Sequence, residues 1–494
     1  MSTRLSKSRF QKGLQCEKAL WLAVHRPDLA EPVTEAQQWI FDQGTEVGRL
    51  AQELFPGGTE VTEDYRHTDE ALTTTQCLLA EGATTLFEPA FYFDGVLVRV
   101  DALVAVGDGT WDLFEVKSGS RVKDENFTDA AVQVYVAEGA GLRVRRAHIV
   151  HLDTSYVWEG GAYDLEQLFA IEDVTQRARA VMGGVPVVLE GFRAMLAGPE
   201  PEVRIGSCCS KPYGCDFSAY CHAGLAGEHP VTDLPRLGED ALHALLELGV
   251  TCIREIPDDF RMLSPAQAKV VRVVKSGLPY VDVPGLARDL ASLTWPVYHL
   301  DFETVNPALP LWPGTRPYQT IPFQYSVHVH HEDGSHEHRE YLHVTTDDPR
   351  RPLTERLIAD LDDAGSVMHY TAFERTRLAD LAAALPDLAG TIGAILGRLV
   401  DLEAIIRART THPATNGLTS IKRVLPAWCP DLSYADLALG DGSAASVRYL
   451  KSVRGLLAPD EVAQLHSDLI EYCGMDTLAM VRLLETLRGR ASGR

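Results

Sequence analysis

The stretch WPVYHLDFET, residues 295–304, carries the strongest single fold signal in the chain. Its apolar, aromatic and β-branched residues predict a strand that opens a new α/β pattern. Successive side chains of a strand alternate between its two faces, so Asp301 and Glu303 are expected to point the same way. The stretch therefore predicts a strand of a sheet with two carboxylates on one of its faces.

The residues that follow continue this α/β pattern. The runs FQYSVHVH (323–330) and HREYLHV (338–344) flank the turn EDGS and predict a hairpin. After the hairpin, the spacing of apolar residues predicts further elements: a helix at 354–364, a short strand at 366–370, a helix at 373–385 and a last helix at 466–487. In the last helix Tyr472 and Asp476 are four residues apart and so share one face.

A D-x-E strand, an F-(D/E) pair at a helix start and a Y-x-x-x-D helix, in this order, resemble the DnaQ-like exonucleases of the ribonuclease H fold. The resemblance is to their DEDD class, tyrosine variant, in which four carboxylates bind two metal ions. It implies that Asp301, Glu303 and Asp476 are ligands and that Tyr472 orients the attacking water. Glu374 takes the place of the second motif's aspartate, and Asp401 is the alternative. The segment also resembles an uncharacterised bacterial domain that is fused behind RecB-like nucleases.

A second candidate site lies near the N-terminus. Residues 96–106, VLVRVDALVAV, predict a strand, GDGT a turn, and WDLFEVK (111–117) the returning strand. A hairpin centred near Asp108 would place Asp101 opposite Glu115, with Lys117 on the same face as Glu115. The carboxylates could hold Mg²⁺ or Mn²⁺, and the lysine could orient water or stabilise the phosphate. A solvated hairpin with ordinary charges is the alternative.

The D…E-x-K pattern, followed by a helical stretch with Gln133 and Tyr135, resembles the RecB-like branch of the PD-(D/E)xK nucleases. The resemblance implies that Asp101, Glu115, Lys117 and Gln133 are the catalytic residues of a restriction-endonuclease-like core. Many relatives carry a metal-binding histidine in an early helix. In this chain the comparable stretch FDQGTEVGRLAQELF (41–55) has Gly48 in that place, with Glu46 as a substitute ligand.

Cysteines cluster before the middle of the chain, in CCSKPYGCDFSAYC (208–221). In a reducing compartment such a cluster indicates metal ligation rather than disulfides. Cys16 is the natural fourth ligand beside Cys209, Cys215 and Cys221, with Cys208 competing with Cys209. This arrangement resembles RecB-like nucleases in which one cysteine before the core and three after it bind a [4Fe–4S] cluster. Zinc is the main alternative, and buried free cysteines are another.

The length, net charge and apolar content of the chain limit its domain organisation and the class of protein it belongs to. At 494 residues the chain predicts several domains: a RecB-like domain (1–222), a helical linker with a helix-hairpin-helix as an alternative (223–290), and a DnaQ-like domain (291–494). The net charge of −23 argues against a broad nucleic-acid-binding surface. The chain has no apolar run that could span a bilayer and no signal-peptide pattern, which predicts a cytoplasmic protein without a membrane partner.

Together these patterns predict an α/β multidomain nuclease that acts on DNA, with RNA as the alternative, in repair, processing or defence. Two readings compete: a non-catalytic nucleic-acid-binding scaffold, and a single exonuclease whose RecB-like half only binds. Two groups of residues have alternative interpretations. The hairpin predicted at 323–344 carries histidines that suit either a metal site or a solvated strand, at positions 328, 330, 331, 336 and 338. Arg316 and Tyr318 suit either a substrate groove or an ordinary loop.

Overall fold

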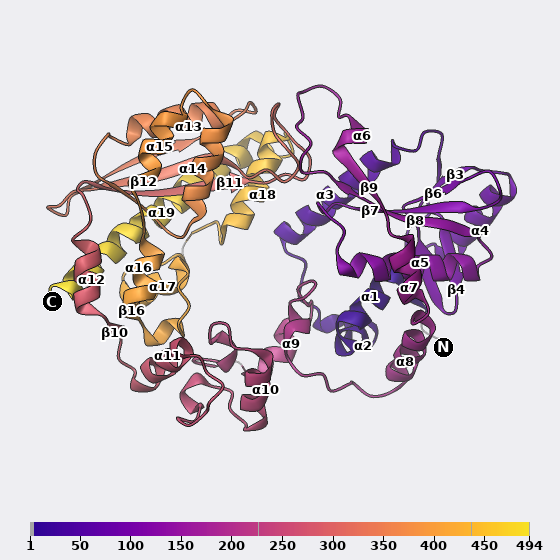
Figure 1. Ribbon diagram of the computed structural model, residues 1–494, viewed down its shortest axis with the longest axis horizontal. Helices are drawn as coiled ribbons and strands as arrows, with labels where there is room; N and C mark the ends of the chain where they lie inside the picture. The colour runs from indigo at the N-terminus through magenta and orange to yellow at the C-terminus, as the bar shows by residue number, and fades with distance from the viewer. Residues whose placement is uncertain (1–3, 226, 436, 494) are drawn as a thin grey trace. The chain divides into compact units, whose positions relative to one another are not determined.

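The computed structural model describes residues 4–225, 227–435 and 437–493 (Figure 1). The chain forms two compact units. The N-terminal unit comprises Met1–Ala223 and Ala308–Tyr318, and the C-terminal unit comprises Gly224–Pro307 and Gln319–Arg494. The segment expected to be a linker supplies three helices to the C-terminal unit: α10 (Glu239–Glu247), α11 (Pro265–Ser276) and α12 (Val283–Leu290).

The N-terminal unit is built on two sheets. The six-stranded sheet has the order β2-β3-β6-β7-β8-β9, and the three-stranded sheet has the order β1-β5-β4. Their strands are β1 (Leu5–Ser6), β2 (Thr59–Glu60), β3 (Thr85–Phe87), β4 (Ala90–Phe93), β5 (Val96–Arg99), β6 (Ala102–Ala105), β7 (Trp111–Lys117), β8 (Val144–Leu152) and β9 (Phe169–Asp173).

One predicted strand of this unit is wrong in detail. The run 96–106 is not a single strand but β5 and β6, which belong to different sheets. The chain bends at Asp101, whose Oδ2 accepts a hydrogen bond from the backbone N–H of Val116 at 2.6 Å. The predicted hairpin itself is confirmed, because Ala102 pairs with Phe114 and Ala105 with Trp111, which centres the turn on Asp108.

Helices cover both faces of the six-stranded sheet. Helix α5 (Asp124–Gly139) packs between the two sheets with its alanines and valines fully buried. Helix α3 (Glu35–Gln52) covers the other face through Val47 and Ala51. The remaining helices are α1 (Lys7–Gln15), α2 (Glu17–His25), α4 (Thr68–Ala80), α6 (Leu165–Leu168), α7 (Thr175–Met182), α8 (Val185–Ala197) and α9 (Ser218–His222).

The C-terminal unit has a five-stranded sheet of order β13-β12-β11-β14-β15. Strand β12 runs antiparallel to β11 and β13, while β14 and β15 run parallel to β11. The strands are β11 (Val297–Val305), β12 (Ile321–His330), β13 (His336–Leu342), β14 (Ser366–His369) and β15 (Leu399–Asp401). The predicted strand at 295–304 and the predicted hairpin after it are confirmed.

Alternation along β11 sorts its side chains onto two faces. Tyr298, Leu300 and Phe302 pack into a core with α13 (Arg350–Asp360), α14 (Phe373–Ala384) and α15 (Ala389–Leu396), which lie together on one side of the sheet (Figure 1). Asp301 and Glu303 face the other side, where the 33-residue α19 (Pro459–Ala491) crosses β11 and β12. The unit also contains α16 (Leu402–Arg409), α17 (Ile421–Trp428), α18 (Gly442–Val453) and the short strands β10 (Tyr280–Val281) and β16 (Thr410–Thr411).

Candidate functional site

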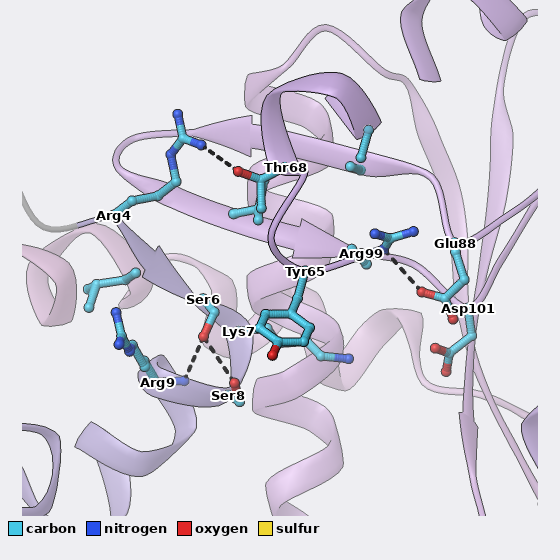
Figure 2. Close-up of a pocket in the computed structure, with 14 residues that line it drawn as sticks. Arg4, Ser6, Lys7, Ser8, Arg9, Tyr65, Thr68, Glu88, Arg99 and Asp101 are labelled. Carbon is cyan, nitrogen blue, oxygen red and sulfur yellow. Dashed lines mark hydrogen bonds and ion pairs between the residues drawn. The ribbon is translucent and has the colours of Figure 1, made fainter. Parts of the chain in front are cut away.

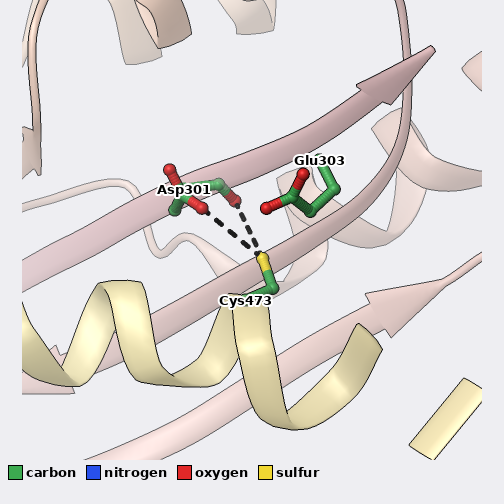
Figure 3. A group of neighbouring side chains, drawn as sticks. All are labelled: Asp301, Glu303 and Cys473. Carbon is green, nitrogen blue, oxygen red and sulfur yellow. Dashed lines mark hydrogen bonds between the residues drawn. The ribbon is translucent and has the colours of Figure 1, made fainter. Parts of the chain in front are cut away.

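The C-terminal unit gathers carboxylates on the face of β11 that α19 covers. Asp301 and Glu303 point the same way, as the strand pattern predicted, and Glu303 is 7% exposed. The thiol of Cys473, from α19, lies between them (Figure 3). One ligand atom from each of these three residues lies within 4.8 Å of the other two. A group of this kind can hold a metal ion.

Two further carboxylates act on this group. Glu374, at the start of α14, is 2% exposed, and Asp476 lies one helical turn after Tyr472 on α19. Burial, followed by the charges of Asp476, Glu374 and Glu303, raises the pKa of Asp301 well above its ordinary value. Burial and the charge of Asp476 do the same to the pKa of Glu303. The four carboxylates therefore repel one another in a partly buried site, which favours the protonation of some of them or the binding of cations between them.

Tyrosines and a lysine complete the site, and the sequence reasoning missed most of them. The hydroxyl of Tyr434 donates to Oδ1 of Asp476 at 2.6 Å. Lys422 Nζ lies 5.5 Å from the ring centre of Tyr434 and 5.0 Å from that of Tyr472. Its charge lowers the pKa of Glu303 and of Asp476, although burial raises both. Neither Tyr434 nor Lys422 stands in a recognisable motif, but Cys473 could have been found from its place between Tyr472 and Asp476.

Asp401, the alternative to Glu374, has a structural role. Its carboxylate caps the N-terminus of α16 and accepts a hydrogen bond from Ala404 N at 2.9 Å. The charge of Glu374, in contrast, raises the pKa of Asp301. Of the two candidates, the geometry places Glu374 with the carboxylate group.

The N-terminal unit brings together its four predicted residues. Lys117 Nζ lies 2.6 Å from Glu115 Oε1, and Gln133 Nε2 donates to Glu115 Oε2 at 2.6 Å. Asp101 sits beside them at the bend between β5 and β6, and burial followed by the charge of Glu115 raises its pKa well above the ordinary value. Tyr135 lies elsewhere, because its hydroxyl donates to Asp94. The exposed Glu46 and the half-buried Gly48 are on α3.

Lys7 and Asp129 are members of this group that the sequence reasoning missed. Lys7 Nζ lies 2.6 Å from Glu115 Oε1, and Lys117 Nζ lies 2.5 Å from Asp129 Oδ2. Burial alone would raise the pKa of Glu115, but Lys117 and Lys7 lower it below its ordinary range. Asp129 precedes Gln133 by one helical turn, and that spacing was a usable signal. No sequence pattern pointed to Lys7.

A pocket with a volume of about 640 Å³ lies next to Asp101 (Figure 2). Its lining includes four basic side chains, those of Arg4, Lys7, Arg9 and Arg99. Tyr65, which is 74% exposed, is also part of the lining. Cations beside an exposed aromatic ring suit a ligand that combines phosphate with a flat base.

The cysteines predicted to bind a cluster share one pocket. Cys16, Cys208, Cys209, Cys215 and Cys221 all line it, with Phe217 and Leu22 as apolar neighbours. Burial followed by the proximity of Cys209 and Cys16 raises the pKa of Cys208 to about 12. Within the described residues, no three of these sulfurs lie within 4.8 Å of one another. The structure thus brings the segments together without choosing between Cys208 and Cys209.

The histidines of the hairpin formed by β12 and β13 are partly buried rather than uniformly solvated. His328 faces His338 across the strands, with ring centres 4.4 Å apart, and its Nδ1 lies 2.8 Å from Thr477 Oγ1. Burial, followed by His338 and His336, lowers the pKa of His328 to about 3. In the described part of the chain these histidines form no group of three with ligand atoms within 4.8 Å.

Arg316 and Tyr318 belong to the N-terminal unit through the segment Ala308–Tyr318. The hydroxyl of Tyr318 donates to the backbone oxygen of Ser118, just after Lys117, at 2.5 Å. Ala308 N also donates to Gln43 Oε1 at 2.8 Å. This segment therefore supports the strand that carries Glu115 and Lys117.

Comparisons with known proteins give a match to one family model and matches to solved structures. A family model described as a domain of unknown function (DUF2779) matches residues 298–420, which include Asp301, Glu303 and Glu374. No curated protein matches the chain. Four solved chains match; one is described as the crystal structure of SSO0001, with 12% identity and a TM-score of 0.22, over 46% of this chain and 89% of that one.

Helix length and hydropathy also bear on membrane insertion. Across residues 4–225, 227–435 and 437–493, no single helix is both long and apolar enough to cross a bilayer. Helices α7 and α8, which meet at a bend of 50°, reach that length and composition only as a pair.

Proposed function

We propose that this chain is a metal-dependent nuclease whose main activity is exonucleolytic and lies in the C-terminal unit. The observation that carries the proposal is a partly buried group of four carboxylates, in which the charges of Glu303, Glu374 and Asp476 raise the pKa of Asp301. Four carboxylates so placed repel one another unless cations or protons lie among them. Phosphodiester hydrolysis by two metal ions uses such a set, because the ions stabilise the attacking and leaving oxygens together.

The fold supports this assignment. The sheet order β13-β12-β11-β14-β15, in which β12 alone runs against the others, fits a ribonuclease H-like domain. The D-x-E pair lies on its central strand and the Y-x-x-x-D pair on the helix that crosses that strand. Mg²⁺ or Mn²⁺ would bind the four carboxylates, Tyr472 would orient the attacking water, and Lys422 would approach the phosphate.

The N-terminal unit is proposed to be a second, RecB-like PD-(D/E)xK centre. The meeting of Asp101, Glu115, Lys117 and Gln133 supports this, and so does the basic pocket beside Asp101. The carboxylates would hold Mg²⁺ or Mn²⁺, and DNA, or alternatively RNA, would be the substrate of both centres.

A specific observation favours a second candidate, in which the N-terminal unit binds substrate without cutting it. Both oxygens of Glu115 are already engaged: Oε1 by Lys7 and Lys117, and Oε2 by Gln133. An ion at Glu115 must compete with these three partners for the lone pairs of the carboxylate. The Lys117 variant below separates the two candidates.

The shared cysteine pocket supports a [4Fe–4S] cluster on Cys16, Cys215, Cys221 and either Cys209 or Cys208. Zinc is the alternative. Four cysteines suit either group, and metal analysis of the purified protein distinguishes them.

The test compares the full-length wild type, Asp301→Ala and Lys117→Ala on labelled single- and double-stranded DNA and RNA with Mn²⁺. Asp301→Ala should cut the exonuclease rate by several orders of magnitude, because it removes a ligand of the metal ions. These ions stabilise negative charge that appears only in the transition state. Lys117→Ala should leave that activity largely intact and remove only a separate cleavage. If Asp301→Ala behaves as wild type while Lys117→Ala abolishes all cleavage, the assignment is wrong.

A further inference from the structure

The thiol of Cys473 points into the carboxylate group of the C-terminal unit (Figure 3). Cys473 is fully buried on α19, directly after Tyr472. Its Sγ lies 3.6 Å from Asp301 Oδ2 and within 4.8 Å of a carboxylate oxygen of Glu303. Nothing in the two-metal chemistry of four carboxylates calls for a sulfur at this position.

The spacing of sulfur and oxygen fits a shared metal ion. Zinc binds thiolate at about 2.3 Å and carboxylate oxygen at about 2.1 Å, and its usual geometry is tetrahedral. Two such ligands on one ion are about 3.6 Å apart. The observed distance between Cys473 Sγ and Asp301 Oδ2 is 3.6 Å.

A separate observation also favours a cation in the same place. Glu374 is 2% exposed, and its Oε2 accepts no hydrogen bond within the described structure. The basic atom that approaches it, His369 Nδ1, is 3.5 Å away and is already hydrogen-bonded to the backbone oxygen of Thr371. A buried carboxylate oxygen without a donor needs a cation or a proton.

We propose that the carboxylate centre of the C-terminal unit binds a thiophilic divalent ion of the Zn²⁺ type, with Cys473 as a thiolate ligand beside Asp301 and Glu303. The inference concerns the metal centre of the proposed exonuclease and so rests on that proposal. On binding, the sulfur–metal bond forms as the S–H bond breaks, and the proton leaves to solvent. Mg²⁺ takes oxygen ligands and would not use the sulfur, whereas zinc accepts both sulfur and oxygen.

The test uses Cd²⁺ as a spectroscopic substitute for Zn²⁺, because cadmium–thiolate bonds absorb in the ultraviolet. Cd²⁺ is titrated into metal-free, full-length wild type, Cys473→Ala and Cys429→Ala. Cys429 is a matched control, since it is a buried cysteine of the same unit whose thiol contacts Thr486 instead of a carboxylate. The N-terminal cysteines contribute equally in all three proteins, so they cancel in the difference spectra.

Cys473→Ala should lose the absorbance of one thiolate ligand and bind Zn²⁺ at this centre at least about tenfold more weakly. Its binding of Mg²⁺ should be unchanged, and Cys429→Ala should match the wild type throughout. Equal spectra and equal Zn²⁺ affinities for Cys473→Ala and Cys429→Ala would overturn the inference.

A second variant covers the case in which Cys473→Ala does not fold. Cys473→Asp replaces the sulfur by oxygen ligands, and its preference should move from Zn²⁺ towards Mg²⁺; an unchanged preference counts against the inference. These titrations contain no nucleic acid, so they are independent of cleavage. A thiolate band that depends on Cys473 in a protein that cuts nothing refutes only the proposed function. Cleavage without a band that depends on Cys473 refutes only the zinc inference.

Discussion

The hydroxyl of Tyr434 donates a hydrogen bond to Oδ1 of Asp476 at 2.6 Å. This hydrogen bond joins the segment after α17 to α19, the helix that carries Asp476. Burial raises the pKa of Asp476, the hydroxyl of Tyr434 and the charge of Lys422 oppose that rise, and the result is a pKa of about 6. This hydrogen bond both orients the carboxylate and keeps it ionised near neutral pH.

Tyr434→Phe should therefore make metal binding by the C-terminal unit more sensitive to acid. Without the hydroxyl the pKa of Asp476 rises further, so the carboxylate is protonated at a higher pH and competes less well for the ion. Mn²⁺ affinity measured against pH should show its midpoint shifted upward in the variant. Tyr449→Phe, which changes a buried tyrosine of the same unit, is the control, and an identical midpoint in both variants would refute the prediction.

The metal-free protein should be more stable at pH 5 than at pH 7. The folded-state pKa values of Asp301, Glu303, Glu374 and Asp476 are all raised. The folded state therefore holds more protons than the unfolded state in this range, and stability is lost as pH rises through the folded pKa values. Asp476 alone, with a shift from 3.8 to about 6, accounts for roughly 1–3 kcal/mol.

Hydrogen exchange of β11 in the presence of EDTA measures this effect where it arises. Added Mn²⁺ at pH 7 should restore the protection seen at pH 5, and Asp301→Asn should flatten the pH dependence. A metal-free protein that becomes less protected between pH 7 and pH 5 would show that the carboxylates do not interact as described.

Glu374 and Asp401 should differ sharply when each is changed to alanine. Glu374→Ala should lower exonuclease activity by several orders of magnitude, because it removes a carboxylate of the metal site. Asp401→Ala should only remove the cap of α16, at a cost of about 1 kcal/mol, and should leave activity in place. Activity assays and thermal unfolding of both variants decide the matter, and the reverse pattern would make Asp401 the ligand.

Lys7→Met should destabilise the N-terminal unit, because it leaves Glu115 and Asp129 with one ammonium instead of two. Removing one partner from a buried ion pair costs about 3 kcal/mol. Arg146→Met is the control, since its pair with Asp173 is half exposed and is worth less than about 1 kcal/mol. Hydrogen exchange of β7 and α5 reports on both variants, and equal protection would mean that Lys7 contributes little.

The Lys7→Met variant also tests whether the ammonium group of Lys7 keeps metal ions away from Glu115. Without the ammonium, Mn²⁺ should bind the N-terminal site more tightly than in the wild type and should recover part of the lost protection. A variant that is destabilised but gains no affinity for Mn²⁺ would assign Lys7 a structural role alone.

The cysteine pocket should hold iron and sulfide in the purified protein, which would then be brown. Cys16→Ser should lose the metal and destabilise the N-terminal unit, because the ligand joins the start of α2 to the segment at 208–221. Cys429→Ser should keep the metal. Metal analysis and visible absorbance check both variants, and colourless protein with stoichiometric zinc and no iron would exclude the cluster.

The sequence by itself determined the elements that carry a local signal. Alternation over 297–305 fixed a strand with Asp301 and Glu303 on one face, and the turn at Asp108 fixed the register that brings Asp101 to Glu115. These features follow from the two-residue period of a strand and from turn chemistry, which depend on near neighbours in the chain.

Only the tertiary structure decided which distant residues join those strands. It brought Lys7 to Glu115 across 108 positions, Cys473 to Asp301 across 172, and Tyr434 to Asp476 across 42. It also split the run 96–106 between two sheets. A lysine, a cysteine or a tyrosine has no local pattern that reveals its partner, because that contact is set by how whole helices pack on the sheet and not by spacing along the chain.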